Sequence, residues 1–303
     1  MNIFCGIDIG GTGVKTLLMD SERKVLSSDF FFTKSVSGPD VFLESLRESI
    51  RKQMDSVVDG VLLAAGIGCT GPVDINSGYI LNPYTLSGLE GLCITRAVSD
   101  DLGVPVYLEN DANTAHLGEI TALEETDPGN TVLVILGTGI GCSVRVGYTL
   151  FRVPGGIHPE IGHTSCGVPS DVPCYCGKNN CMENILSGTA INRDAKRFFN
   201  STPEAVLDIC DTDKKRQFRE NLVCGLFNMA ATMAGIFDSK LMILAGGMHD
   251  FYAKYLLKAA QERLDLLNPV FGTTKLITAK LGSDSGRLGA AILAQERFGE
   301  VHE

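Results

Sequence analysis

The sequence has no tryptophan and no uninterrupted apolar run close to the roughly 20 residues that a membrane-spanning helix needs. It also lacks the basic and long apolar regions of a signal peptide, because MNIFCGIDIGGT enters a strand-like run at once. The chain has 26 basic and 36 acidic residues. Its net charge of −10 gives little attraction to nucleic acid or anionic membranes. We therefore expect a cytoplasmic protein whose partners include neither nucleic acid nor a membrane.

Disulfide-scaffold proteins are excluded as well. Ten cysteines in 303 residues are far below the density of such a scaffold, and a chain of this length can bury a sizeable core without them. Seven of the ten are scattered, mostly among apolar neighbours, and we expect them to be small buried hydrophobic residues. The other three, Cys174, Cys176 and Cys181, lie together in CYCGKNNC.

The order of the expected elements repeats along the chain. Residues 1–33 predict three strands, a helix with apolar residues at helical spacing follows Pro39, and VDGVLLAAGIGC and VPVYLEND are buried strands. The order β-β-β-α-β-α-β then recurs in weaker form from TVLVILG to KLMILAGG. This repetition predicts an α/β fold of two related domains with a cleft between them, and a boundary near 119–128, where the chain becomes polar.

Two glycine-rich loops follow strands at equivalent places in the two halves. GIDIGGTGVK offers backbone N–H groups and a hydroxyl to an anion, and Asp8 at the strand end can hold a hydrated Mg²⁺. A single loop of this kind is also compatible with an ordinary hairpin turn. Two of them resemble the phosphate loops of the actin-like ATPase (ribonuclease H-like) and sugar-kinase fold, with a glycine pair after KLMIL for the nucleoside. The candidate nucleotide-binding residues are Asp8, Gly10, Gly11, Thr12, Gly137, Thr138, Gly139, Gly246 and Gly247.

A candidate base follows the strand VPVYLEN. Asp111 stands where this strand ends and a helix begins, a position at which Asn and Asp are also favoured as N-caps. The two roles are compatible. A carboxylate at the carboxyl end of a strand can accept the proton of an attacking hydroxyl, and Asn110 beside it can bind a neighbouring hydroxyl.

The clustered cysteines have a candidate fourth partner, His163, eleven residues upstream of Cys174. Cys174, Cys176, Cys181 and His163 supply three thiolates and one imidazole, a complete tetrahedral Zn²⁺ shell with no open position, as in structural sites. A disulfide would leave one thiol over, and chance clustering of buried cysteines is the remaining alternative.

These blocks together resemble the ROK family (repressors, open reading frames, kinases). PEIGHTSCGVPSDVPCYCGKNNCMEN is similar to that family's E-x-G-H followed by C-x-C-G-x-x-G-C-x-E, and DIGGT, ENDAN, LGTGIG, LAGG and SGRLGAAILA resemble its other blocks in order. The resemblance implies a first domain of residues 1–119 and 287–303 and a second of 120–286. It implies Asp111 as the catalytic base, Asn110, Glu160, His163 and Glu183 as sugar ligands, and the two loops as cradles for ATP phosphates. By themselves, Glu160 and Glu183 would be expected to be surface glutamates.

The sequence departs from the family pattern at four places, and the departure just before Glu160 bears on the identity of the sugar. Asn180 replaces a usual glycine, a change we expect to be tolerated because Asn also enters the left-handed region. His158-Pro159 replaces small residues before Glu160, and Thr70 stands where proline is common. ILNPYTLSGLEG lacks a usual tryptophan and looks closer to N-acetylmannosamine kinases, whereas VPCYCGK looks closer to fructokinases and glucokinases.

The resemblance implies an ATP- and Mg²⁺-dependent kinase that phosphorylates the 6-hydroxyl of a hexose such as glucose, fructose, mannose or allose. It also implies a structural Zn²⁺ and a homodimer. The alternative within enzymes is an N-acetylmannosamine or other acylamino-hexose kinase. A sugar-responsive repressor would need a helix-turn-helix ahead of the first loop, and we expect none because that strand begins within three residues of Met1. A sugar-binding protein without catalysis would need a degraded Asp111 or phosphate loop, and both are intact.

Overall fold

A computed structural model of the chain describes residues 1–33, 38–123, 128–152 and 159–302. The chain divides into two compact units. Unit 1 comprises Met1–Glu124, Arg152–His158 and Ser283–Glu303, and unit 2 comprises Glu125–Phe151 and Pro159–Gly282. The domain bounds expected from the sequence are not tested by this division and stay a prediction. Residues 124–127 of the expected boundary and His158 lie outside the described residues.

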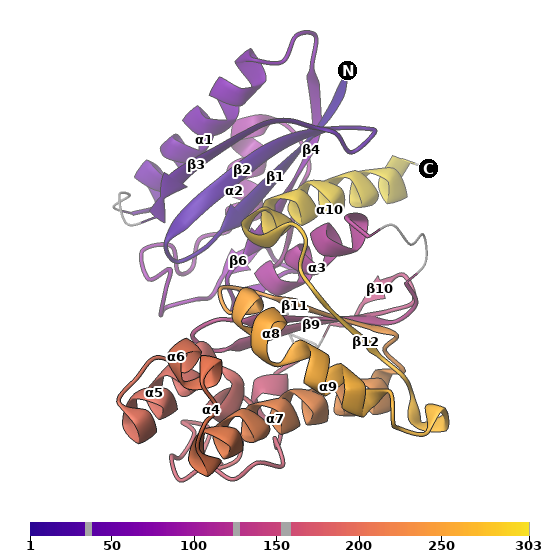
Figure 1. Cartoon of the computed structure of the whole chain (residues 1–303). Coiled ribbons are helices and arrows are strands. Elements are labelled where there is room, and N and C mark those ends of the chain that lie inside the picture. The colour runs from indigo at the N-terminus through magenta and orange to yellow at the C-terminus, as the bar shows by residue number, and fades with distance from the viewer. Residues whose placement is uncertain (34–37, 124–127, 153–158, 303) are drawn as a thin grey trace. The chain divides into compact units, whose positions relative to one another are not determined.

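Unit 1 is built on a five-stranded sheet of order β3-β2-β1-β4-β7 (Figure 1). Strands β1 to β3 form an antiparallel meander, and β1, β4 and β7 run parallel. The elements of unit 1 are β1 (Asn2–Ile9), β2 (Gly13–Asp20), β3 (Val25–Phe32), α1 (Pro39–Asp55), β4 (Val61–Cys69), β5 (Val73–Asp74), β6 (Tyr79–Ile80), α2 (Ile94–Leu102), β7 (Val106–Asn110), α3 (Asp111–Thr121) and α10 (Ser285–His302).

The three parallel strands of unit 1 end together. Ile9 pairs with Cys69, and Cys69 pairs with Asn110, so β1, β4 and β7 reach the same edge of the sheet. The segments after these strands therefore begin side by side, which is where ligands of open α/β sheets bind.

Both faces of this sheet are covered. The alternate apolar residues of β1 from Ile3 to Ile9 belong to a core shared with α1 and α2. On the other face α10 lies against β1 and β4 at backbone contact (Figure 1). A Cβ on Gly6 would lie 1.9 Å from the carbonyl oxygen of Arg287, and one on Gly66 would lie 1.9 Å from that of Ala290. Glycine is required at both positions, and the C-terminal helix is thereby fixed against the strand that carries Asp8.

Unit 2 repeats the same topology in a sheet of order β10-β9-β8-β11-β12. The predicted repetition of the element order is therefore confirmed: a meander of β8 to β10 is followed by the parallel strands β11 and β12. The elements of unit 2 are β8 (Thr131–Leu136), β9 (Ile140–Val146), β10 (Thr149–Leu150), the 3₁₀ turn η2 (Ile161–His163), α4 (Glu183–Leu186), α5 (Gly188–Phe199), α6 (Pro203–Asp208), α7 (Asp213–Phe237), β11 (Leu241–Ala245), α8 (His249–Tyr255), α9 (Leu257–Leu264), the 3₁₀ turn η3 (Pro269–Phe271) and β12 (Lys275–Thr278); the turn η4 (Gly282–Asp284) leads back to unit 1.

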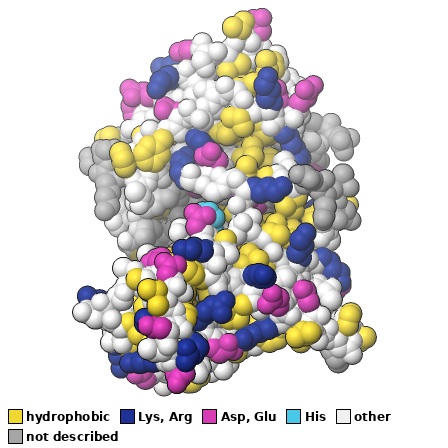
Figure 2. Space-filling model, in the orientation of Figure 1, with side chains coloured by type: hydrophobic (Ala, Val, Ile, Leu, Met, Phe, Trp, Pro, Cys, Tyr) yellow, Lys and Arg dark blue, Asp and Glu magenta, His cyan; other side chains and the backbone are white. Residues whose placement is uncertain are grey.

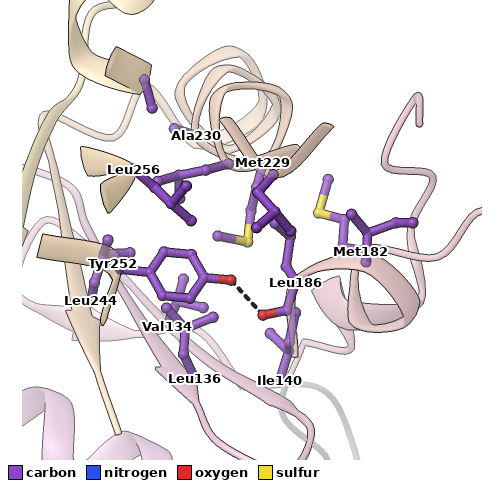
Figure 3. Close-up of a cluster of buried hydrophobic side chains, with 14 of the residues drawn as sticks. Val134, Leu136, Ile140, Met182, Leu186, Met229, Ala230, Leu244, Tyr252 and Leu256 are labelled. Carbon is purple, nitrogen blue, oxygen red and sulfur yellow. Dashed lines mark hydrogen bonds between the residues drawn. The ribbon is translucent and has the colours of Figure 1, made fainter. Parts of the chain in front are cut away.

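The core of unit 2 joins its sheet to α4, α7 and α8 (Figure 3). Tyr252 is fully buried in it, and its hydroxyl donates a hydrogen bond to the carbonyl oxygen of Leu186 at the end of α4. This bond satisfies the one polar group that a tyrosine brings into a core. It also fixes α4, whose first residue is Glu183, against the strands of the second glycine-rich loop.

Helix α7 is long and apolar enough by composition alone to cross a membrane. Its apolar residues Leu222, Leu226, Met229 and Met233 are buried in the core of unit 2, which is the pattern of a core helix in a folded domain. Its composition is therefore explained by packing.

Charged side chains of both signs are mixed over the visible surface (Figure 2). Several form ion pairs, such as Arg197 with Asp171 and Arg263 with Glu220, each at 2.7 Å. Exposed pairs of this kind contribute about 0–1 kcal/mol each. The stability of the two units therefore comes mainly from their apolar cores.

Candidate active site

The carboxyl edge of the unit 1 sheet carries two carboxylates, Asp8 near the end of β1 and Asp111 directly after β7. The pKa of Asp8 is raised to about 6, mainly by burial and to a smaller extent by the charge of Asp111, against the lowering effect of Lys15 and Arg287. The Asp8 carboxylate lies 3.7 Å from the ammonium group of Lys15. The carboxylates of Asp8 and Asp111 are close enough to interact electrostatically. Oxygen ligands of this kind suit a hard cation, and Mg²⁺ is the cation that the sequence led us to expect.

Asn110, not Asp111, is the N-cap of α3. Its side-chain oxygen accepts a hydrogen bond from the Ala112 N–H at 2.9 Å, and Asp111 is the first helical residue. The structure therefore separates the two roles that the sequence left open at Asp111. The cap uses only the amide oxygen of Asn110, and its amide nitrogen remains available.

That amide nitrogen is buried and has no hydrogen-bond partner within the described parts of the chain. Asn110 is 1% exposed, and a Cβ on Gly71 would lie 3.1 Å from its Nδ2 atom. A buried donor left unpaired costs about 1–3 kcal/mol, so native structures seldom keep one without a partner or a ligand. The donor stands beside Asp111, where a substrate hydroxyl is expected.

The Asp111 carboxylate is held at both oxygens. Oδ1 accepts the Ala112 N–H at 2.9 Å, and Oδ2 accepts the Thr70 hydroxyl at 2.9 Å. Thr70 follows β4, the strand next to β7, so the contact joins the ends of neighbouring strands. The sequence marked Thr70 only as a departure from proline. Its contact with Asp111 depends on the sheet register and could not be derived from composition or spacing.

Asn82 is a second residue that sequence analysis did not identify. It is 1% exposed; its amide nitrogen donates to the Gly71 carbonyl at 2.7 Å and to the Thr85 hydroxyl at 2.8 Å. It thus ties the loop of Thr70 to residues 84–89, which line a cavity of about 430 Å³ together with Gly11. The signal available in the sequence was an asparagine directly before a proline in ILNPYTLSGLEG, a pair that is typical of turns.

Glu109 supports the same edge from inside the sheet. It is 3% exposed, and one carboxylate oxygen accepts from the Asn110 N–H at 3.0 Å and from the Asn113 amide at 2.9 Å. The other oxygen pairs with Arg152 at 2.7 Å. A buried carboxylate needs such partners, and together they fix the backbone at Asn110.

The first glycine-rich loop is a tight turn between β1 and β2. The Gly10 N–H donates to the Gly13 carbonyl at 3.0 Å, and the Thr33 N–H donates to the Thr12 carbonyl at 3.1 Å. Gly11 lies between these bonds and borders the cavity described above. The turn follows directly on the strand of Asp8, as the sequence predicted.

The second loop, Gly137 to Gly139, takes the equivalent place in unit 2, between β8 and β9, and is a tighter turn. The Gly137 N–H donates to the Gly139 carbonyl at 3.0 Å, so Thr138 lies at the tip of the turn. The carboxylate of Glu183 accepts the Ile140 N–H at 2.9 Å. Glu183 therefore lies against the base of this loop, and its role as a sugar ligand stays a prediction.

Gly246 and Gly247 stand between β11 and α8, as expected. Gly246 has φ of +88°, and a Cβ there would lie 2.5 Å from the carbonyl oxygen of Leu136. The N–H of Met248 donates to the same carbonyl at 3.0 Å. The glycine pair thus lies beside the second loop at the carboxyl edge of the unit 2 sheet.

The cysteine cluster closes around His163. The donor atoms of His163, Cys174, Cys176 and Cys181 all lie within 4.8 Å of one another, and all three thiols are free. His163 Nδ1 lies 3.6 Å from Cys174 Sγ, and Cys176 Sγ lies 3.3 Å from Cys181 Sγ. A Zn²⁺ with sulfur ligands at about 2.3 Å separates them by about 3.8 Å, so the donor set fits this ion.

The electrostatics of the thiols agree with a cation site. Burial raises the pKa of Cys181 to about 12, whereas the Lys178 backbone N–H lowers the pKa of Cys176. A buried thiol with a raised pKa becomes a thiolate when a metal ion supplies the compensating charge.

The expected conformation of Asn180 is wrong. Within CYCGKNNC the left-handed conformation belongs to Gly177, at φ of +91°, and Asn180 does not adopt it. Its amide donates to the Ser165 hydroxyl at 2.7 Å, and its carbonyl accepts the Cys166 N–H at 2.7 Å. Asn180 is accommodated because its side chain has a partner, not because the backbone turns left-handed.

The second ring nitrogen of His163 has a partner that the sequence did not indicate. Nε2 lies 2.8 Å from the hydroxyl of Tyr175, and the two rings meet edge to face at 4.9 Å. Glu160, at the start of η2, accepts the His163 N–H through its backbone carbonyl at 3.1 Å. Partial desolvation of its hydroxyl group, together with the carboxylates of Glu183 and Glu160, raises the pKa of Tyr175 to about 12, although the residue as a whole is exposed. Of the predicted sugar ligands in unit 2, His163 and Glu183 contact the Tyr175 hydroxyl, and Glu160 acts on it electrostatically.

Comparison with known proteins identifies the family and the fold. The ROK family matches residues 4–297. A glucokinase of Streptomyces coelicolor is 28% identical over 323 residues, 98% of each chain. An N-acetylmannosamine kinase of Escherichia coli is 27% identical over 301 residues, 95% of this chain and 97% of its own. The crystal structure of a ROK family glucokinase from Streptomyces griseus in complex with glucose and AMPPNP has a TM-score of 0.71 at 26% identity, over 97% of this chain and 99% of that chain. The fold is accordingly the actin-like ATPase fold, as predicted.

Proposed function

The chain belongs to the ROK family, and we propose that it is an ATP-dependent hexose kinase that transfers the γ-phosphoryl group of ATP to the 6-hydroxyl of its sugar. The observation that carries the proposal is the pair at the end of β7. Asp111 is a fixed carboxylate, and beside it Asn110 holds a buried amide donor without a partner. A base and a hydroxyl-binding donor in adjacent positions are what the attack of a sugar hydroxyl on phosphorus requires.

Asp111 would accept the proton of the attacking hydroxyl while Asn110 binds the neighbouring hydroxyl. Thr70 and Ala112 hold the carboxylate in one orientation, so it does not have to reorganise when the reaction occurs. Orientation of this kind, together with charge stabilisation, supplies most of the catalysis in phosphoryl transfer.

The two glycine-rich turns and the Gly246–Gly247 pair would bind ATP. Backbone N–H groups of Gly11 and Thr12 in one loop and of Thr138 and Gly139 in the other suit phosphate oxygens, since no Cβ at the glycines obstructs close approach. Asp8 would hold a hydrated Mg²⁺, which when bound neutralises charge on the phosphates. The raised pKa of Asp8 supports this role, because a buried carboxylate is stabilised by a cation.

Glu160, His163 and Glu183 would bind further sugar hydroxyls, and the cysteine cluster would hold a structural Zn²⁺ through His163, Cys174, Cys176 and Cys181. The ion would fix the ring of His163 and the CYCGKNNC turn. All four metal positions are taken by side chains, so none is left for a substrate.

An N-acetylmannosamine kinase is the second candidate. It is supported by the near equality of the two identities, 27% with the N-acetylmannosamine kinase and 28% with the glucokinase. A repressor is not favoured, because a base and two phosphate loops serve catalysis. The homodimer and the cytoplasmic location stay predictions.

ADP release with Mg-ATP tests the proposal. The sugars are glucose, fructose, mannose, allose, N-acetylglucosamine and N-acetylmannosamine, and a protein without sugar added gives the background. We expect one sugar to be clearly preferred and its 6-phosphate to form. Phosphate transfer to water alone, or no turnover with any sugar by folded, zinc-containing protein, would contradict the proposal.

A further inference from the structure

The hydroxyl of Tyr175 occupies the hydrogen bond of His163 that a sugar would use. His163 Nδ1 faces Cys174 Sγ at 3.6 Å, on the side of the metal-ligand cluster, which leaves Nε2 as the nitrogen that points elsewhere. Nε2 lies 2.8 Å from the Tyr175 hydroxyl. With a metal ion bound at Nδ1, a neutral imidazole would carry its proton on Nε2 and would donate it to the Tyr175 hydroxyl.

Besides the contact with His163, the tyrosine hydroxyl has one further hydrogen bond, to the Glu183 carboxylate. The tyrosine side chain is 83% exposed, and its described ring contact is the edge-to-face one with His163 at 4.9 Å. The backbone on either side is fixed by contrast. Cys174 donates its N–H to the Lys178 carbonyl at 2.7 Å, and Gly177 donates to the Cys174 carbonyl at 2.9 Å. Tyr175 can therefore leave His163 by rotation of its side chain without any change in the turn.

We propose that Tyr175 is a specificity-determining residue that competes with the sugar for the Nε2 hydrogen of His163. This inference rests on the proposed function. One N–H group has one strong acceptor at a time, so a sugar hydroxyl reaches His163 only when the tyrosine hydroxyl has been displaced into water. A hexose with a hydroxyl at the matching position recovers the bond that the displacement breaks. A sugar without it loses that bond and is discriminated against.

The carboxylates nearby strengthen the argument for competition. Glu160 and Glu183 both act on the Tyr175 hydroxyl electrostatically, so the hydroxyl lies among the groups that would bind sugar. In the absence of sugar the tyrosine hydroxyl thus lies between His163 and the Glu183 carboxylate and occupies the place that a sugar hydroxyl would take.

The test compares Tyr175→Phe with the wild type and with Tyr148→Phe. The control tyrosine is also in unit 2 and 77% exposed, and its described contact is with Arg145 through the ring, which phenylalanine keeps. Isothermal titration calorimetry would give Kd for the sugar that the panel above selects, with no nucleotide present. Metal content by atomic absorption would show that the CYCGKNNC turn is intact in each protein.

The proposal predicts that Tyr175→Phe lowers Kd for the sugar by about two- to tenfold, the effect of one net hydrogen bond, and that Tyr148→Phe leaves it unchanged. The imidazole Nε2 proton of His163 should be visible by NMR in sugar-free wild type and lost by exchange in Tyr175→Phe. Equal affinities would overturn the inference while leaving the kinase proposal in place. Weaker binding by Tyr175→Phe would make the tyrosine a sugar ligand and would also overturn it. If neither protein binds any sugar, the proposed function fails and this inference falls with it.

Discussion

The hydroxyl of Thr70 donates a hydrogen bond of 2.9 Å to Oδ2 of Asp111. The two residues follow neighbouring parallel strands, β4 and β7, and their contact is set by the pairing of Cys69 with Asn110. With the Ala112 N–H on Oδ1, the bond leaves the Asp111 carboxylate a single orientation, at the sheet edge where the first glycine-rich loop also begins. The proposed base and the proposed phosphate loop are thus positioned by one sheet.

Thr70→Val should lower kcat by about tenfold and leave KM for the sugar nearly unchanged. Valine keeps the shape of threonine and removes the donor, so the carboxylate gains freedom while the pocket keeps its volume. Steady-state kinetics with the preferred sugar checks this split. Thr70→Ser keeps a hydroxyl and serves as the matched control, which should retain most of kcat. A raised KM at unchanged kcat would show that Thr70 shapes the sugar pocket and does not position the base.

The buried carboxyl of Asp8 should make stability depend on pH in a defined window. Its pKa is raised from 3.8 to about 6, mainly by burial. Between these values the folded state binds more protons than the unfolded chain, so the free energy of unfolding falls as pH rises through the window. A shift of this size corresponds to at most about 3 kcal/mol above pH 6.

Asp8→Asn removes that titration. Urea unfolding without added Mg²⁺ should therefore show the variant more stable than the wild type near pH 7.5, by about 1–3 kcal/mol, and the difference should shrink toward about pH 4. A variant that is less stable at the higher pH would show that the Lys15 pair outweighs the burial of the carboxyl. ATP turnover by Asp8→Asn should fall in either case if Asp8 holds the cation.

Cys176→Ser should release the metal ion and loosen unit 2. The hydroxyl is a poor substitute for a thiolate, and binding of the ion contributes to folding because no preformed site exists in the unfolded chain. Cys210→Ser is the control, since Cys210 is in unit 2 outside the cluster, with its thiol on the Val206 and Leu207 carbonyls. Atomic absorption and thermal unfolding measure the effect. Equal zinc content in the two variants would contradict the assignment of the cluster.

Local chemistry was enough to predict most of the framework. Glycines after apolar strands indicated both loops, and the recurring element order indicated two sheets of the same topology. Cysteine and histidine spacing indicated the cluster that the structure brings within 4.8 Å. These features depend on residues close in sequence, or on repetition, and both are visible in a linear chain.

The contacts that refine the site could not be predicted in the same way. Thr70 meets Asp111 across 41 residues, and Asn82 ties two turns together; both depend on strand register and loop path. The contact of Tyr175 with His163 could not be predicted for a different reason. Its neighbours Cys174 and Cys176 account for the motif, and only the direction of its side chain brings it to His163.

Asp111→Asn tests the central claim most directly. Asparagine preserves shape and removes the base, so we expect kcat to fall by about 10²–10⁴-fold while calorimetry shows the sugar bound with nearly unchanged Kd. Near-normal turnover by this variant, in protein that binds the sugar normally, would contradict the account.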